Sequence, residues 1–177
     1  HQHAALDATF NLDRVMAEGF DAVLLAVGLG QSVPLPGSSR PRQGVIGALE
    51  FLAQMKKAPA CSGFVLVLGG GNTAMDAALT AHRAGAEDVA IVYRRSFAEM
   101  PAWPEERDRA LTEGVHFLTL TAPRDYVTDA DGKLVGLEVV RTRLGALDAR
   151  GRRQPQPIAG TQHVLPADLV IEALGQQ

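Results

Sequence analysis

A glycine-rich turn between a short apolar run and a helical pattern is the feature that most constrains the fold of this chain. Val65–Leu68 runs into Gly69-Gly70-Gly71-Asn72-Thr73-Ala74, which has the spacing G-x-G-x-x-A. In a βαβ unit the first glycine permits a tight turn, the second lets the backbone approach a pyrophosphate, and the small last residue keeps the helix near the sheet. The N–H groups at the helix start then face the phosphates. The turn therefore predicts a dinucleotide site.

The residues after the turn support this interpretation. Small side chains continue along the expected helix at Ala77, Ala78 and Ala81, and the apolar run Asp88–Tyr93 follows as a second strand. A stripe of this kind lets a helix lie close to a parallel sheet. Strand, glycines, small helix face and second strand occur together within about thirty residues, as the motif requires.

Two arginines favour one dinucleotide over the other. Arg94 and Arg95 end the second strand, at the place, about 20 residues beyond the glycines, where an NAD site has an acidic residue for the ribose 2′-hydroxyl. Guanidinium groups instead pair with a 2′-phosphate through charge-assisted hydrogen bonds. The alternative is a solvated pair at a strand end. The pattern favours NADPH over NADH.

The rest of the chain alternates strand and helix patterns, which indicates an α/β class: a Rossmann-like three-layer dinucleotide-binding domain with a parallel sheet and a small antiparallel β insert. We expect strands at Phe20–Val27, Phe64–Leu68, Asp88–Tyr93, Val115–Leu120 and Leu169–Ala173, and helices over 45–55, 73–84 and 104–113. We expect antiparallel strands at Tyr126–Thr128 and Leu134–Arg143 joined by an Asp-Gly turn, a linker over 31–43 and an exposed loop over 150–160.

One segment echoes another. Asp21–Gly28 aligns without gaps against Asp168–Gly175, with Asp, Val, Ala and Gly at matching places. Two Val- and Leu-rich strands can look alike by chance. Alternatively, the first is the closing strand of a truncated domain. On that interpretation residues 1–43 are the tail of one domain plus a linker, and 44–177 are the nucleotide-binding domain.

Composition excludes several other functions. A formal net charge of −3 gives no electrostatic reason to expect nucleic acid or an anionic membrane as a partner. The apolar runs are too short to span a bilayer, and the N-terminus does not resemble a signal peptide. The single cysteine, Cys61, excludes an internal disulfide and suits a cytoplasmic location. His82, His116 and His163 lack ligand-like spacing, so we expect no metal site.

Some residues allow two interpretations. Asn72 either contacts a phosphate or caps the helix, and Asp76 is expected to be structural. Glu172, a charged residue in an apolar strand, faces either a ligand crevice or solvent. Cys61 has no basic neighbour and is expected to be an inert thiol. The sequence gives no account of Trp103.

Four motifs in order resemble a known family. They are Gly69-Gly-Gly-Asn-Thr-Ala-Met-Asp76, Val92-Tyr-Arg-Arg95, Glu99-Met-Pro-Ala102 and Asp168-Leu-Val-Ile-Glu-Ala-Leu-Gly-Gln176. The chain resembles the NADPH-dependent small (beta) subunit of glutamate synthase and its wider relatives, including the N-terminal half of dihydropyrimidine dehydrogenase. The segment from Arg141 to Arg153 is similar to that family's variable insert.

The resemblance implies cofactors and partners. In the family one domain holds FAD and another NADPH, hydride passes from nicotinamide to flavin, and electrons leave through iron–sulfur clusters to an acceptor subunit or domain. The resemblance implies FAD and iron–sulfur clusters. The FAD domain's own glycine fingerprint and the cysteine-rich segment are absent here, so these groups are expected in other parts of the full-length protein. The implied partners are thus the missing FAD-binding half and an electron acceptor.

The resemblance also assigns residues. Gly70, Gly71, Asn72 and Thr73, after Gly69, would hold the pyrophosphate, and Arg94 and Arg95 the 2′-phosphate. Ala173, Leu174 and Gly175 would approach the nucleotide from the last strand, and Gly28, Leu29 and Gly30 would meet the flavin nucleotide. No catalytic acid, base or nucleophile is expected, because the flavin carries the redox chemistry.

Two other functions fit parts of the sequence. A stand-alone module that senses NADPH would account for the missing FAD fingerprint but not for the repeated strand. A methyl-donor enzyme also uses a glycine-rich loop, but Ala74 and the two arginines argue against it.

Overall fold

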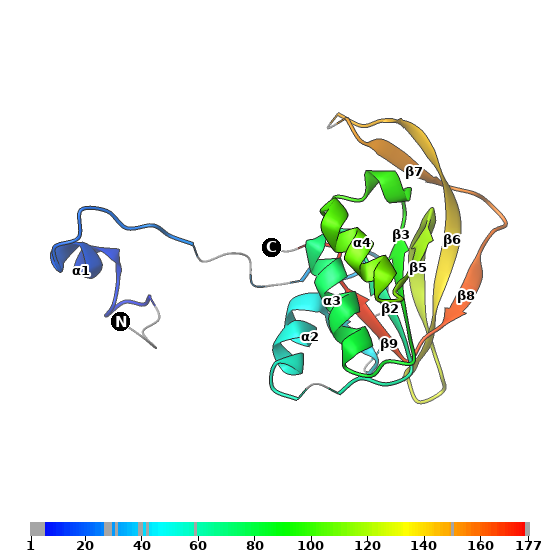
Figure 1. Ribbon diagram of the computed structural model, residues 1–177, viewed down its shortest axis with the longest axis horizontal. Helices are drawn as coiled ribbons and strands as arrows, with labels where there is room; N and C mark the ends of the chain where they lie inside the picture. The colour runs from blue at the N-terminus through cyan, green and yellow to red at the C-terminus, as the bar shows by residue number, and fades with distance from the viewer. Residues whose placement is uncertain are drawn as a thin grey trace.

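The computed structural model of the chain describes residues 6–26, 30, 32–38, 41, 43–58, 60–149 and 151–175. In this part the elements are α1 (Leu12–Ala17), β1 (Val45–Gly47), α2 (Ala48–Met55), β2 (Phe64–Leu68), α3 (Asn72–Arg83), β3 (Asp88–Tyr93), the 3₁₀ turn η1 (Phe97–Glu99), α4 (Pro104–Thr112), β4 (His116–Thr119), β5 (Thr121–Thr128), β6 (Leu134–Leu147), β7 (Arg153–Pro157), β8 (His163–Pro166) and β9 (Leu169–Glu172). They form three layers, which Figure 1 shows side by side.

The central layer is a five-stranded parallel sheet with the order β1-β9-β2-β3-β4. Val65 pairs with Val89 of β3 on one side and with Leu169 of β9 on the other. The continuous apolar runs of β2 and β3 suit these positions, because a parallel sheet covered on both faces excludes water from both sides of its strands. The expected parallel α/β sheet is confirmed.

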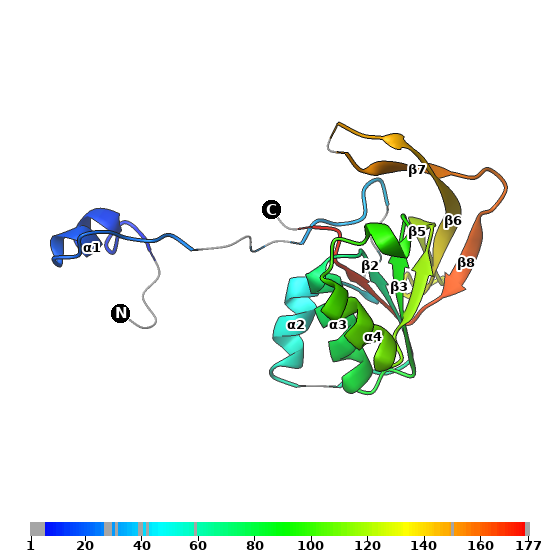
Figure 2. The ribbon, with the colours of Figure 1, turned by 45° about the horizontal axis from the view of Figure 1, so that its top comes forward.

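Helices α2, α3 and α4 cover one face of this sheet (Figure 2). Along α3 the alanines predicted to pack closely are all buried, with exposed fractions of 0 to 1% at Ala74, Ala77, Ala78 and Ala81. Their small side chains let the start of α3 lie near the ends of β2 and β3. The predicted strand–turn–helix–strand unit is thus confirmed.

Antiparallel strands cover the other face, in the order β5-β6-β7, with β8 paired to β6. Leu137 and Val139 of β6 are fully buried and belong to the same apolar cluster as Leu66, Leu68 and Val92 of the parallel sheet. The hairpin predicted between β5 and β6 is present. The antiparallel insert is therefore the third layer of the domain.

The strand expected at Phe20–Val27 is absent from the described part of that segment. Residues 20–26, the described part of that segment, contain no helix or strand, and Leu24 is 90% exposed. Figure 1 shows this segment and α1 lying apart from the three layers. The expectation was wrong because an apolar run becomes a strand only beside a partner that takes its backbone hydrogen bonds.

Two other boundaries differ from expectation. Residues 45–47 are a strand rather than the first turn of a helix, because Val45 and Ile46 pair with β9. The loop expected over 150–160 contains β7, whose Gln156 pairs with Arg143 of β6. A mostly exposed edge strand lacks the alternation that marks a half-buried one, so its sequence looks like a loop.

Residues 32–38 have no helix or strand, as expected of the linker. No helix among the described residues has both the length and the apolar character needed to cross a bilayer.

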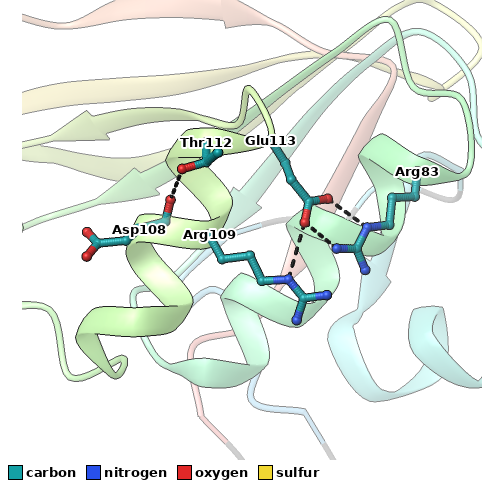
Figure 3. A network of polar contacts seen from close by, with 5 residues as sticks. All are labelled: Arg83, Asp108, Arg109, Thr112 and Glu113. Carbon is teal, nitrogen blue, oxygen red and sulfur yellow. Dashed lines mark hydrogen bonds and ion pairs between the residues drawn. The ribbon is translucent and has the colours of Figure 1, made fainter.

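An exposed ion-pair network joins the ends of α3 and α4 (Figure 3). Arg83 donates through Nε to Glu113 Oε2 at 2.7 Å, and Arg109 donates to Glu113 Oε1 at 3.2 Å. The hydrogen bond from Arg83 holds the pKa of Glu113 below its ordinary value of 4.5. Because the folded carboxyl has the lower pKa, its stabilising contribution is present above about pH 4.5 and is lost as pH falls through the folded pKa.

Glu113→Gln should therefore lower the free energy of unfolding slightly at neutral pH, since exposed pairs contribute little. The difference from the natural chain should shrink as pH falls below about 4.5, and it should shrink in high salt at neutral pH. Urea unfolding over a pH series measures it, with the exposed Glu87→Gln as the control. A difference that stays constant with pH would contradict this role for the Glu113 carboxylate.

Candidate nucleotide-binding site

A cavity of about 520 Å³ opens at the carboxyl ends of β2, β3 and β9. Most of the residues predicted for the nucleotide line it: Gly69, Gly70, Gly71, Arg94, Arg95, Ala173, Leu174 and Gly175. These residues come from three separate segments that the parallel sheet brings together. In open α/β sheets this edge, outside the carboxyl ends of the strands, is where ligands bind.

Each of the three positions in the turn is glycine for a different structural reason. Gly69 has a φ of 132°, and a Cβ there would lie 2.3 Å from the backbone oxygen of Ala173. A Cβ on Gly70 would lie 2.7 Å from the Tyr93 ring. At Gly71 an added Cβ meets no protein atom within 4 Å. The first two glycines thus allow the turn to pack, whereas the third leaves space on the cavity side.

Helix α3 begins directly at this turn. Gly71 is its N-cap residue, with φ −91° and ψ 176°, and no side chain caps the helix. The first N–H groups of a helix have no partner within the helix, and they carry the positive end of its dipole. The start of α3 therefore presents donors and partial positive charge beside the cavity, which suits an anion.

Asn72 and Thr73 are the first two residues of α3, next to the cavity lining. The Asn72 side-chain oxygen accepts a hydrogen bond of 2.9 Å from the backbone N–H of Trp103, which is the N-cap residue of α4. Ala102 N–H likewise donates to Gly70 O at 3.0 Å. These bonds fasten the loop before α4 to the glycine turn. Trp103 is therefore held through its backbone N–H, whereas its side chain is 65% exposed.

Arg94 and Arg95 have different surroundings at the end of β3. Arg94 is exposed, and its backbone oxygen accepts from Thr142 Oγ1 at 2.7 Å. Arg95 is only 7% exposed, and its Nε donates to the backbone oxygen of Arg153 at 2.7 Å. Both line the cavity. The antiparallel layer thus holds the backbone at Arg94 and the side chain of Arg95.

Several lining residues were not predicted. Val33, Leu35 and Pro36 of the linker form one wall, and Arg152, which precedes β7, lies at another. Val33 N–H donates to Gly175 O at 3.0 Å, so the linker is joined to the segment after β9. Spacing in the sequence carries no signal for these residues, because their place depends on contacts between distant segments.

Glu172 faces neither a ligand crevice nor solvent. It is 1% exposed, and its Oε1 accepts hydrogen bonds from Leu35 N–H at 2.7 Å and from the Tyr126 hydroxyl at 2.5 Å. The carboxylate therefore joins the parallel sheet, the linker wall of the cavity and the antiparallel layer. Its role is positional, because it fixes the backbone of a residue that lines the cavity.

Of the other candidate residues, Gly28 and Leu29 lie outside the described residues, and Gly30 is exposed and is not among the residues that line the cavity. Burial raises the pKa of the Cys61 thiol, which lowers its thiolate fraction. Among the described residues no group of three or more His, Cys, Asp or Glu side chains is arranged to hold a metal ion.

The fold and the cavity together define a nucleotide-binding domain of the Rossmann class, with a glycine turn at the start of its crossover helix. The chain belongs to the pyridine nucleotide-disulphide oxidoreductase family, whose model matches residues 7–177. The domain is accordingly an NAD(P)-binding domain of that family, homologous to the small subunit of glutamate synthase.

Curated relatives are about 40% identical to the chain. It is 41% identical over 166 residues to the "NADPH-Fe(3+) oxidoreductase subunit beta" of Geobacter sulfurreducens, covering 91% of this chain and 25% of the relative. It is 38% identical over 179 residues to the "Glutamate synthase [NADPH] small chain" of Escherichia coli (strain K12), covering 93% and 37%. The chain therefore spans about a quarter to under two fifths of the length of these relatives.

A solved structure has the same fold. FprA of Mycobacterium tuberculosis in complex with NADPH superposes with a TM-score of 0.66 at 20% identity, covering 95% of this chain and 52% of that one. At this identity the match supports the fold alone.

Proposed function

We propose that the chain is the NADPH-binding domain of a cytoplasmic flavoprotein oxidoreductase of the glutamate synthase small-subunit type. The cavity at the glycine turn is the proposed NADPH site. Residues 44–177 form the proposed NADP-binding domain, and residues 1–43 the tail of an FAD-binding domain with its linker. When bound, NADPH supplies a hydride, for which the proposed acceptor is FAD in the remainder of the protein, with iron–sulfur clusters and an acceptor subunit beyond it.

The single observation that carries this proposal is that the glycine turn and the two arginines line the same cavity. Gly71 leaves space where a pyrophosphate would lie against the start of α3, and Arg94 and Arg95 line the same cavity. A dinucleotide with a 2′-phosphate carries negative charge at both of these places. The residues present therefore fit NADP(H).

The chain's own residues would bind and orient the nucleotide. Backbone N–H groups of Gly70, Gly71 and the start of α3 would hold the pyrophosphate, and Arg94 and Arg95 the 2′-phosphate. Ala173 and Gly175 would pass along the nucleotide from the end of β9. Two relatives are named for NADPH, the NADPH-Fe(3+) oxidoreductase subunit beta and the glutamate synthase [NADPH] small chain, which supports the same choice of nucleotide.

Arg94→Gln tests the choice of nucleotide. Calorimetry of the 177-residue chain should show tighter binding of NADPH than of NADH. The substitution should weaken NADPH binding roughly tenfold to a hundredfold, because it removes a charge-assisted hydrogen bond, and should leave NADH binding unchanged. Arg94 is the better position to change because Arg95 is buried and bonded to Arg153, so its loss also disturbs the fold.

Arg124→Gln is the matched control, because Arg124 is exposed on β5 and outside the cavity lining. It should bind both nucleotides as the natural chain does. Equal binding of NADH and NADPH by the natural chain would show that the 2′-phosphate assignment is wrong.

A further inference from the structure

A second, smaller cavity of about 320 Å³ lies beside the proposed nucleotide site. It is lined by Arg95, Glu99, Leu147, Gly151, Arg152 and Arg153. Arg95 and Arg152 line both cavities, so they stand at the boundary between them. One comes from the end of β3 and the other from the β6–β7 hairpin, which Figure 1 shows reaching beyond the parallel sheet.

Arg152 is held in place by Asp148, four residues earlier in the same hairpin. Asp148 Oδ1 accepts a hydrogen bond of 2.9 Å from Arg152 N–H, and Asp148 Oδ2 lies 3.5 Å from Arg152 Nε. The Nε is one of five N–H donors in a guanidinium, so the terminal nitrogens remain available for a second anion. The side chain is 56% exposed, so a ligand can reach it.

The hairpin is also fixed to the strand end that holds the predicted arginines. Arg95 Nε donates to Arg153 O at 2.7 Å, and Arg153 Nε lies 3.9 Å from Glu99 Oε1. Glu99 in turn accepts from the Ser96 N–H and hydroxyl at 3.2 and 3.0 Å. These contacts hold Arg153, the residue next to Arg152, against the end of β3. The fold therefore determines the position of Arg152 relative to Arg95.

We propose that Arg152 is a third specificity-determining cation, which binds the 2′-phosphate of the adenosine ribose together with Arg94 and Arg95. The inference rests on the proposed function and adds a residue outside the glycine fingerprint. A dianionic phosphate at this boundary meets guanidinium groups from two elements. The carboxylate of Glu99 lines only the second cavity, and its repulsion places the phosphate on the side of the first.

The test uses two small probes, adenosine 2′,5′-bisphosphate and adenosine 5′-monophosphate, which differ only in the 2′-phosphate. Calorimetry of the full 177-residue chain and its Arg152→Gln variant measures both affinities. Arg152→Gln should weaken binding of the bisphosphate about tenfold and leave the monophosphate unchanged. Arg143→Gln is the matched control, because Arg143 lies on the same hairpin and bonds Gln156 rather than lining either cavity. Thermal unfolding of each variant checks that the hairpin is retained.

The outcomes separate this inference from the proposed function. If the natural chain prefers the bisphosphate and Arg94→Gln removes that preference while Arg152→Gln does not, Arg152 has no part in the site and the proposed function stands. An equal loss with Arg143→Gln would also overturn the inference, since a general charge effect would then explain it. If the natural chain shows no preference for the bisphosphate, both proposals fail.

Discussion

Gly71→Ala should weaken NADPH binding roughly a hundredfold, or by about 2.7 kcal/mol, with little change in the stability of the ligand-free protein. The backbone at Gly71, with φ −91° and ψ 176°, is allowed for alanine, and the new Cβ meets no protein atom within 4 Å. Alanine is the poorer N-cap residue but costs less conformational entropy, and the two effects, each below about 1 kcal/mol, oppose each other. The methyl group would instead occupy the space proposed for the pyrophosphate.

Gly69→Ala is the contrasting variant for this prediction. At a φ of 132°, with the new Cβ 2.3 Å from Ala173 O, it should destabilise the fold by roughly 2–3 kcal/mol. Urea unfolding and calorimetry on both variants distinguish the two roles, because only Gly71→Ala should lose binding while keeping its stability. Unchanged NADPH affinity in Gly71→Ala would mean that the pyrophosphate does not lie against this turn.

The sequence predicted well the local structure around the glycine turn, where the elements are contiguous in the chain. From Phe64 to Arg95, strand, turn, helix and strand follow one another, and each carries its own local signal in apolar runs, glycines and small residues. The family resemblance assigned Gly175 to the nucleotide, and Gly175 lines the same cavity as Gly71 because the carboxyl ends of parallel strands meet at one edge of the sheet.

The sequence could not predict the features that depend on pairing between distant segments. Strand β1 exists because Val45 pairs with Val170, and β7 because Gln156 pairs with Arg143. The segment from Phe20 to Val27 has as apolar a pattern as β9, yet its described residues form no strand. Arg152 lies in a polar stretch whose sequence pattern does not show that Arg152 lines the cavity.

Glu172 is the strongest case of a residue whose role only the structure reveals. An acidic residue in an apolar strand indicates that its carboxylate has a polar partner, but the sequence does not identify that partner. In the fold, its carboxylate binds Leu35 N–H and the Tyr126 hydroxyl, from segments 137 and 46 residues away. One side chain thus holds both the linker wall of the cavity and the antiparallel layer on the parallel sheet.

Glu172→Ala is expected to destabilise the protein by about 3–5 kcal/mol, because it removes the acceptor of two buried hydrogen bonds and opens a cavity. Since domains are stable by only about 5–15 kcal/mol, Glu172→Gln, which keeps one acceptor oxygen, is the milder variant to compare. Tyr126→Phe should cost about 1–3 kcal/mol in the natural chain and much less alongside Glu172→Ala, because the two side chains share one hydrogen bond. Urea unfolding of the natural chain, Glu172→Ala, Tyr126→Phe and the double variant measures this coupling. Additive losses would show that the carboxylate does not hold the antiparallel layer through Tyr126.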